Sequence, residues 1–313
     1  MVAAAKASYK ITNWRKYNES LVQRGSITFW FSEEALKQWQ HANDQAKVGH
    51  PFVYSDIAIE SLLILRELFR LPYLQTEGLG RSLVQLMQVT LEIPDYTSLA
   101  KRAASLEITL DVATRKGSID IVVDSTGLKV FGEGEWKTRK HGVSKRRTWR
   151  KLHLAVNADT QEIEAEVLTE NSGHDGDQVE ELLEHIPAPI DSFTGDGAYD
   201  QWKVYTGLER REIKPIIPPR RSAKIKQHGN SNQPPLPRDE ALRAIRLVGR
   251  KQWKVDAGYH RRSLSETAMF RMKCCFGGNL KNRELPNQRA ETRLRCKILN
   301  RFTHLGLPQF EWN

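Results

Sequence analysis

Apolar positions in the first hundred residues recur at helical spacing. The segments predicted as helices are Ser55 to Arg70, Gly78 to Gln88 and Thr97 to Ser105, with prolines between them. A shorter helix is expected at Ser32 to Trp39, where a serine precedes the first turn. This part of the chain is therefore predicted to be mainly helical.

The last two of these predicted helices allow two interpretations. They are spaced like a helix-turn-helix, in which Thr97 to Leu106 would enter a groove of DNA. Two helices packed in an ordinary bundle are more common, and residues 1–112 carry 12 Lys and Arg against 12 Asp and Glu. The sequence leaves both interpretations open.

The hydrophobic period changes after residue 117. Ile119 to Val123 is a β-rich run, and Leu152 to Val156 and Glu162 to Val167 alternate polar with apolar or small residues around a turn. This pattern predicts a strand followed by an antiparallel hairpin with one buried face. Ile190 to Thr194 is expected to form a fourth strand. The order strand, strand, strand, helix, strand predicts a mixed sheet.

The helix before the fourth strand is expected to begin with a capping box formed by Asp177 and Glu180. His174 and Asp175 precede it. Because Asp177 already supplies a cap, these two are interpreted as loop and capping residues in preference to a catalytic histidine.

Later segments complete the predicted architecture. Pro215 to Asp239 is basic and rich in proline, which indicates an exposed and partly disordered insertion. Gln288 to Thr303 is predicted to be a basic helix. We expect a mixed α/β domain over residues 113–313, with an insertion near 200–255, after a mainly helical domain over residues 1–112.

Composition narrows the class of protein. The chain has three cysteines, two of them adjacent. Their number and spacing indicate neither a disulfide framework nor a zinc site. The N-terminus lacks the apolar core of a signal peptide, and charges interrupt the most apolar run, Ile59 to Phe69. We therefore expect a cytoplasmic protein that neither crosses nor binds a membrane.

The net charge of +10 arises entirely after residue 112. Lys137 to Lys151 contains eight basic residues and no acid, and residues 201–254 contain 14 basic and four acidic residues, with tryptophans interleaved. A solvated face would explain one such run, but several favour a nucleic-acid partner over a solubilising surface or an acidic membrane. The candidate DNA contacts in the first run are Lys137, Arg139, Lys140, Arg146 and Arg147.

Two aspartates lie where predicted strands end. Asp124 follows the first strand, and Asp196 follows the fourth between two glycines. In a sheet of this order the first and fourth strands are neighbours, so both carboxylates can reach one point, where Mg²⁺ would relieve their repulsion. Each can also be a plain turn residue, and Asp120 and Asp200 are rival ligands.

A third acid is surrounded by cations in the segment Gly258 to Lys273. On a regular helix, Tyr259, Arg262, Glu266 and Lys273 form a stripe about 60° wide, opposite an apolar stripe. Glu266 can then join the two aspartates. The alternative is that Ser263 and Glu266 form a capping box and that the cations are merely solvated.

These motifs together resemble a known family. DSTG around Asp124, GDGAYD around Asp196 and the spacing Tyr-x2-Arg-x3-Glu-x6-Lys are similar to bacterial insertion-sequence transposases of the DDE class, most closely the IS five family. The resemblance implies a ribonuclease H-like catalytic domain with a mixed sheet flanked by helices. It implies that Asp124, Asp196 and Glu266 are the catalytic, metal-binding triad.

Further expectations follow from the resemblance. Two Mg²⁺ ions, with Mn²⁺ as a substitute, would support cleavage at the element ends and transfer of 3′-hydroxyls to target DNA. Tyr259, Arg262 and Lys273 would contact DNA, and the N-terminal domain would recognise the terminal inverted repeats. The partners would be double-stranded DNA and at least one further copy of the chain, in the bacterial nucleoid.

Two other functions remain open from the sequence. A structure-specific nuclease of the same fold would cut without joining, and a DNA-binding regulator would do neither. No P-loop or dinucleotide fingerprint indicates a nucleotide-using enzyme.

Overall fold

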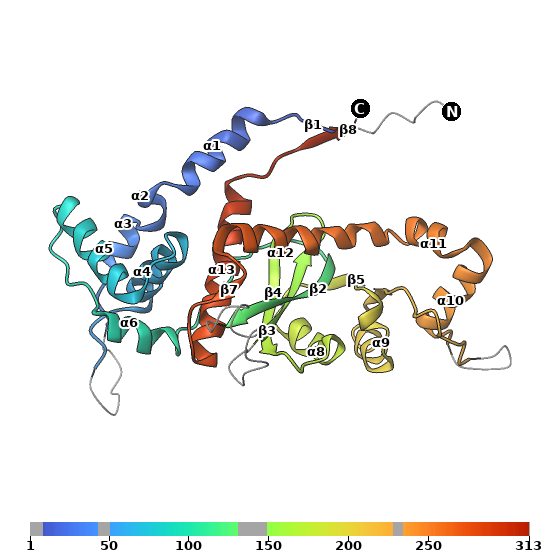
Figure 1. Ribbon diagram of the computed structural model, residues 1–313. Coiled ribbons are helices and arrows are strands. Elements are labelled where there is room, and N and C mark those ends of the chain that lie inside the picture. The colour runs from blue at the N-terminus through green and yellow to red at the C-terminus, as the bar shows by residue number, and fades with distance from the viewer. Residues whose placement is uncertain (1–8, 43–50, 131–148, 228–233, 313) are drawn as a thin grey trace, which may run out of the picture. The chain divides into compact units, whose positions relative to one another are not determined.

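The computed structural model describes residues 9–42, 51–130, 149–227 and 234–312 (Figure 1). The chain divides into two compact units. The first contains Met1–Ile108 and Lys297–Asn313, and the second contains Thr109–Cys296. The five cations proposed as DNA contacts between residues 137 and 147 lie outside the described residues. None of the described helices is long and apolar enough to cross a membrane.

The first unit is mainly helical, as predicted. Its long helices begin at capped positions: Ser55 accepts a hydrogen bond from the Ala58 amide (3.1 Å), and Asp95 accepts from the Thr97 amide (2.7 Å). A two-stranded antiparallel sheet joins the two ends of the unit. The elements are β1 (Tyr9–Ile11), α1 (Trp14–Arg24), α2 (Ile27–Trp30), α3 (Glu33–Lys37), α4 (Asp56–Leu68), α5 (Tyr73–Leu86), α6 (Tyr96–Ala103) and β8 (Phe310–Trp312).

Helices α4, α5 and α6 pack against one another. Arg102 on α6 donates to the Tyr54 carbonyl (2.9 Å) and forms an ion pair with Asp56 at the start of α4. Arg102, one of the two basic residues in the last turn of α6, therefore bonds to groups inside the unit. The interpretation of α6 as a DNA-inserting helix stays a prediction.

The second unit contains the predicted mixed sheet. Its strand order is β4-β3-β2-β5-β6, with β2, β3 and β4 antiparallel and β5 and β6 parallel to β2. The adjacency of β2 and β5 and the mixed α/β arrangement confirm the predicted ribonuclease H-like class. The strands are β2 (Ile119–Val130), β3 (Trp149–Asn157), β4 (Ile163–Glu170), β5 (Ile190–Thr194), β6 (Lys214–Ile216) and β7 (Asn279–Leu280), which pairs with the end of β2.

Helices cover both faces of this sheet (Figure 1). On one face, α8 (Val179–Glu184) and α9 (Trp202–Glu209) bury an apolar core that includes Ile121, Val123 and Phe193. On the other face, α12 (Ser263–Phe276) packs against β2 and β3. The prediction of one buried face for the hairpin was therefore wrong.

Because both faces of the hairpin are covered, the alternating acids at and just before β4 are buried. Glu162, Glu164 and Glu166 are all buried, although their pattern predicted solvent exposure. Glu166 faces α13 (Leu285–Leu305), where Thr292 donates to it (3.4 Å). Burial raises the pKa of Glu166 from 4.5 to about 7, against the opposing effect of Arg293.

This shift predicts a pH-dependent stability. The pKa of Glu166 is higher in the folded protein than in the unfolded chain. Its contribution to the free energy of unfolding is therefore complete below about pH 4.5 and is lost as the pH rises through about 7. The loss amounts to about 3 kcal/mol at most. Glu166→Gln cannot ionise, so urea unfolding should show it gaining stability over the wild type between pH 5 and pH 8. Exposed Glu170→Gln on the same strand is the control, and an equal gain there would contradict the assignment.

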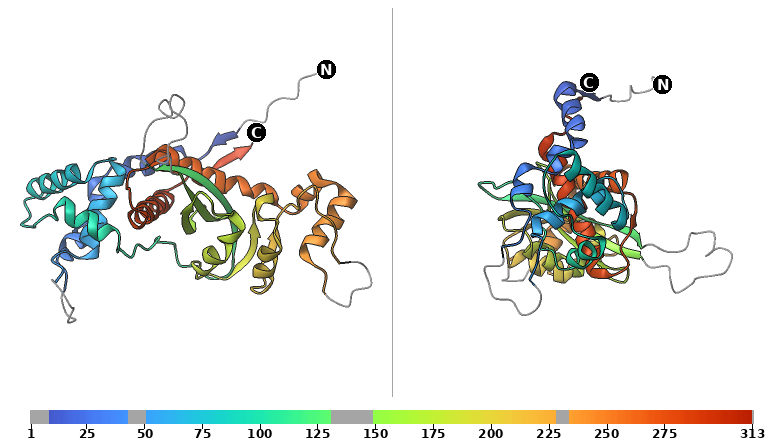
Figure 2. Two further views of the ribbon diagram at one scale, coloured as in Figure 1. Left: turned by 60° about the horizontal axis from the view of Figure 1, so that its bottom comes forward. Right: turned by 90° about the vertical axis from the view of Figure 1, so that its left-hand side faces the viewer.

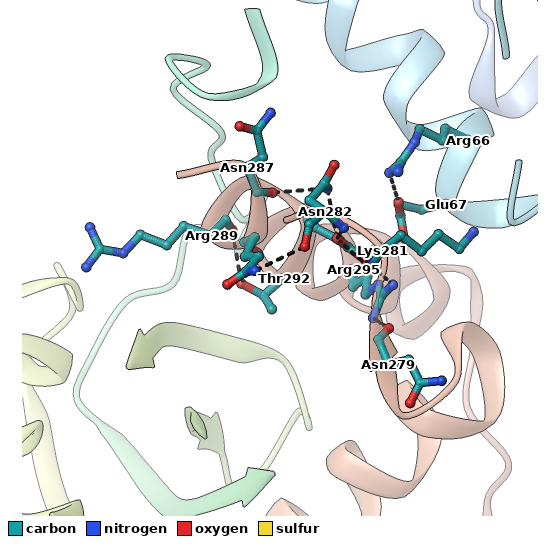
Figure 3. A network of polar contacts seen from close by, with 11 residues as sticks. Arg66, Glu67, Asn279, Lys281, Asn282, Asn287, Arg289, Thr292 and Arg295 are labelled. Carbon is teal, nitrogen blue, oxygen red and sulfur yellow. Dashed lines mark hydrogen bonds and ion pairs between the residues drawn. The ribbon is translucent and has the colours of Figure 1, made fainter. Parts of the chain in front are cut away.

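The segment after α12 is held by a buried polar network (Figure 3). Glu291 accepts hydrogen bonds from the backbone amides of Lys281 (2.9 Å) and Asn282 (3.0 Å) and from the Asn282 side chain (2.8 Å). It also pairs with Arg295, which donates to the Asn279 carbonyl (3.1 Å). The network ties β7 to α13 and thereby fixes the C-terminal end of α12.

The proline-rich segment is more ordered than predicted. Ile217 and the two prolines after it are buried, and the fully buried Asp239 accepts from the Lys226 (3.0 Å) and Gln227 (2.7 Å) amides. The segment is thus packed at Ile217 to Pro219 and at Asp239, which supplies acceptors for backbone groups that lack a strand partner. Most of residues 220–227 are exposed, as predicted. Helices α10 (Pro237–Val248) and α11 (Arg250–Asp256) follow it.

Candidate active site

Asp124 and Asp196 belong to neighbouring parallel segments. Asp196 lies two residues beyond the end of β5, as predicted, but Asp124 lies in the middle of β2 and not at the predicted strand end, because β2 continues to Val130. Val122 of β2 is in register with Thr194 of β5, and each aspartate is two residues further along. Side chains alternate along a strand, and Val123 faces the α8–α9 core, so Asp124 points to the opposite face. This is the face that α12 covers.

Asp124 is held by two hydrogen bonds. Its Oδ1 accepts from the Ser125 amide (2.8 Å), and its Oδ2 accepts from Arg262 (2.8 Å). Burial raises the pKa of Asp124, and the charges of Asp196 and Glu266 raise it further, while the Ser125 amide and Arg262 oppose the shift. A carboxyl with a raised pKa beside two other acids is typical of a functional site.

Glu266 lies in the first turn of α12 and shares a cation with Asp124. The Arg262 guanidinium donates to both carboxylates, from Nη1 to Asp124 and from Nη2 to Glu266. The predicted capping box is absent: Arg262 is the N-cap, without a side-chain cap hydrogen bond, and the Ser263 hydroxyl donates to the His260 carbonyl (3.1 Å). Glu266 is therefore free of a capping role.

Tyr259 to Arg262 does not continue α12 as a regular helix. These residues form a short 3-10 helix, η3 (Tyr259–Arg262), which follows Gly258 in the left-handed region (φ 68°). The tighter turn departs from the regular helix on which the polar stripe was projected. Arg262 still reaches Glu266, but through the η3–α12 junction.

Tyr259 is buried beside the acids. Burial raises the pKa of its phenol, and the charges of Asp196, Asp124 and Glu266 add to the rise while Arg262 opposes it. The charges of all three predicted acids thus raise the pKa of the same side chain, Tyr259. The Lys254 ammonium lies 4.7 Å from the centre of the Tyr259 ring, which adds another cation.

Lys273 is exposed on α12, seven residues beyond Glu266. Seven residues are about two helical turns, so both side chains project from the same side of α12, about 10 Å apart along its axis.

Asp196 is held in place by the backbone that follows it. Its side chain caps η2 (Gly197–Tyr199) by accepting a hydrogen bond from the Ala198 amide (2.8 Å). The structure thus joins Asp124 to Glu266 through Arg262 and relates Asp196 to them through charge.

The donor set suits a divalent ion chemically. Three carboxylates offer the hard oxygen ligands that Mg²⁺ prefers, and a positive charge already lies between two of them in the form of Arg262. As they stand, no three His, Cys, Asp or Glu side chains among the described residues form a cluster ready to hold a metal. An ion that bound both Asp124 and Glu266 would require Arg262 to release at least one of them.

The rival aspartates have other partners. Asp120 accepts from Arg261 (2.8 Å), which also pairs with Asp159. Asp200 is fully engaged: Arg238 donates two hydrogen bonds to it (2.6 and 3.0 Å), and Tyr205 and an amide donate more. Burial opposes ionisation of Asp200, but these donors hold its pKa below the ordinary value. Asp200 is therefore less available than Asp124, whereas Asp120, with a side chain 35% exposed, is held by an arginine much as Asp124 is.

A buried histidine near the site was missed in the sequence. His153 on β3 is fully buried; its Nε2 lies 3.1 Å from the Thr169 hydroxyl and its Nδ1 lies 3.4 Å from Asp175. Burial lowers the pKa of His153 to about 4. Asp175 forms an ion pair with Lys151 (2.8 Å) and does not act as the expected helix cap. The alternation of β3 gave no signal, since it placed His153 among the polar positions opposite Leu152 and Leu154.

The capping box expected at the start of α8 is also absent. Gln178 is the N-cap, without a side-chain hydrogen bond. Asp177, in the 3-10 turn before α8, instead pairs with Lys203 on α9, and Glu180 pairs with Arg211 (2.7 Å) just after α9. These acids connect the α8 and α9 regions because the oppositely charged partners lie in and just after the neighbouring helix.

Comparisons with known proteins agree with this arrangement. Two family models, each described as "Transposase DDE domain", match residues 115–301 and residues 22–133. The first of these spans covers more than half of the chain and contains Asp124, Asp196 and Glu266. A solved structure, "Cryo-EM structure of piggyBac transposase synaptic complex with hairpin DNA (SNHP)", is 9% identical and covers 96% of this chain and 80% of that chain, with a TM-score of 0.39. A likeness at that level supports no inference about activity.

Proposed function

The chain belongs to the transposases with a DDE domain, and we propose that it cuts DNA at the ends of an insertion sequence and joins the 3′-hydroxyl ends to target DNA. The observation that carries this proposal is the bridge from Arg262 to both Asp124 and Glu266, with the charge of Asp196 acting on the same carboxyl. Acids on or just after two neighbouring interior strands and on a helix that packs on the sheet suit phosphoryl transfer.

We assign the metal-binding role to Asp124, Asp196 and Glu266. When bound there, two divalent ions, Mg²⁺ or Mn²⁺, would activate the attacking oxygen and stabilise the leaving oxygen of the phosphodiester. The three carboxylates would hold the ions at the exposed rim, since the Glu266 side chain is 55% exposed and Asp124 is 18% exposed. DNA could reach the rim without opening the core.

Arg262 and Lys273 would position the DNA backbone. A guanidinium binds a phosphate through two parallel hydrogen bonds, so Arg262 can exchange a carboxylate for a phosphate oxygen without leaving a charge unpaired. Lys273 would neutralise a second phosphate further along α12. Tyr259, buried beside Arg262, would keep the guanidinium on the acid side of η3.

The finer assignments rest on sequence features. The spacing Tyr-x2-Arg-x3-Glu-x6-Lys supports a bacterial origin within the IS five family. We propose that the N-terminal helical unit contributes to recognition of terminal inverted repeats and that two copies act together, because two element ends must be joined. The five cations proposed between residues 137 and 147, namely Lys137, Arg139, Lys140, Arg146 and Arg147, would add phosphate contacts.

The proposal is tested with the purified full chain and DNA fragments that carry the ends of its own element. With Mg²⁺ we expect cuts at the element ends, and with pre-cut ends we expect products joined to a target plasmid. EDTA should remove both activities. Cutting without any joining would indicate a nuclease, and binding without either reaction would indicate a regulator.

A further inference from the structure

A cluster of cations lies where α10 and α11 meet. We call Arg246, Arg250, Lys251 and Lys254 the basic corner. Arg246 and Lys251 are exposed and the other two are half-buried. Within the part of the chain that the structure describes, none of the four forms an ion pair, although many other cations of this unit do.

Two of these charges do not favour folding. Helix α11 begins with Arg250 and Lys251 and has no acid in its first turn. Cations at this end oppose the helix dipole, so an acid would stabilise the helix better. Arg246 and Lys254 lie in the last turns of α10 and α11, where a cation favours the helix. Arg250 and Lys251 therefore call for a role outside the fold.

The helices that carry the corner are firmly anchored. Arg238 at the base of α10 binds the buried Asp200 through two hydrogen bonds, and Asp239 is fully buried. Leu242 of α10 and Trp253 of α11 are buried, and the two helices pack together. In both Figure 1 and Figure 2 the pair extends from the end of α12, away from the central strands of the sheet. The corner is thus a fixed projection.

A row of positive charge connects the corner with the acids. Lys254 lies against the ring of Tyr259, and η3 packs against α11. Arg262, at the other end of η3, contacts Asp124 and Glu266. From Arg250 to Lys254 the helix rises about 6 Å. Because each strand of duplex DNA carries one phosphate per ~3.4 Å of helix axis, this length matches about two successive phosphates of one strand.

We propose that the basic corner binds the backbone of duplex DNA next to the phosphodiester that is cut. The inference rests on the proposed function, because it uses the acids to place the reacting bond. Charge complementarity selects DNA: residues 201–254 carry 14 basic and four acidic residues, and the four cations of the corner have no acid bound to them. Leu247, 86% exposed, lies among them and would face the sugar edge of the groove.

The test compares two triple variants of the full chain that lose the same charge. One is Arg246→Gln, Arg250→Gln and Lys251→Gln. The matched control is Lys203→Gln on α9 together with Arg210→Gln and Arg211→Gln just after it. Helix α9 packs on the face of the sheet opposite to α12, and these three cations pair with acids. Fluorescence anisotropy with an element-end duplex gives Kd over a range of salt concentrations.

We expect the corner variant to bind at least about tenfold more weakly at ~0.1 M salt. The slope of log K against log salt should become shallower by about 2 to 3, since each lost phosphate contact removes roughly 0.9. The control should keep the wild-type slope. Lys251→Gln alone, at an exposed position, should make the slope shallower by about 1. This single variant replaces the triple variant in the test if the triple variant does not fold.

A wild-type slope in a folded corner variant overturns the inference. So does a wild-type slope together with a change of oligomeric state in Leu247→Ser, since the corner would then be an interface between copies of the chain. If the slope falls as expected but the wild type never cuts DNA, the corner stands as a DNA contact and the proposed transposition reaction fails. The two results separate the two proposals.

Discussion

Replacing Asp124 by asparagine is expected to lower the rate of DNA cleavage by at least about 10³-fold, which corresponds to about 4 kcal/mol of transition-state stabilisation. Asparagine keeps the shape of the side chain but cannot supply the negative charge that a divalent ion needs. Asp196→Asn and Glu266→Gln should behave alike. Binding of element-end DNA should change little, because the acids repel phosphates.

Asp120→Asn is a matched control for this prediction. Asp120 lies on the same strand and, four residues earlier, faces the same side of the sheet, but it pairs with Arg261. It should retain cleavage near the wild-type rate. Cleavage assays on a labelled duplex measure both rates. Equal loss in both variants would mean that Asp124 acts through stability, and normal cleavage by Asp124→Asn would remove it from the site.

The second large effect is expected on stability, at Glu291. Glu291→Met should lower the free energy of unfolding by about 3 to 5 kcal/mol. Two backbone amides and the Asn282 side chain would lose their acceptor, and the buried Arg295 would lose its carboxylate. Urea unfolding followed by circular dichroism gives this value, with the slope against urea held as a check on two-state behaviour.

Glu284→Met controls for the chemical change alone. Glu284 is exposed at the start of α13, and we expect a change within about 0.5 kcal/mol. A small effect at Glu291 would show that the network carries little energy. Because the network fixes the end of α12, a folded Glu291→Met variant should also cut DNA more slowly than its binding would indicate.

The strands were predictable because their signal is local. Ile190 to Thr194 was predicted with the bounds that β5 has, since a short β-rich run between prolines and glycines has few alternatives. β6 was missed because a proline interrupts its three residues. Helix α9 was missed because the stretch after Tyr199 lacks a clear period.

Local patterns misled where the partner was distant in sequence. The acids of β4 alternate as on an exposed face, yet α13, more than 100 residues later, covers Glu166. The capping spacing at Ser263 and Glu266 is a common tetrapeptide, and Arg262 competes for Glu266 because Asp124 holds the guanidinium beside it. No local pattern contains such competition.

The sequence by itself determined which residue types follow β5 and stand in the first turn of α12, because period, turn residues and spacing are properties of neighbouring positions. It placed Asp124 at a strand end, whereas β2 continues to Val130 because its later residues pair with β3 and β7. Only the tertiary structure decided that Arg262 lies between Asp124 and Glu266, that Asp120 and Asp200 are taken by other arginines, and that the cations of the basic corner are not. Which charge pairs with which depends on distances through space, and those are set by strand order and helix packing across the whole unit.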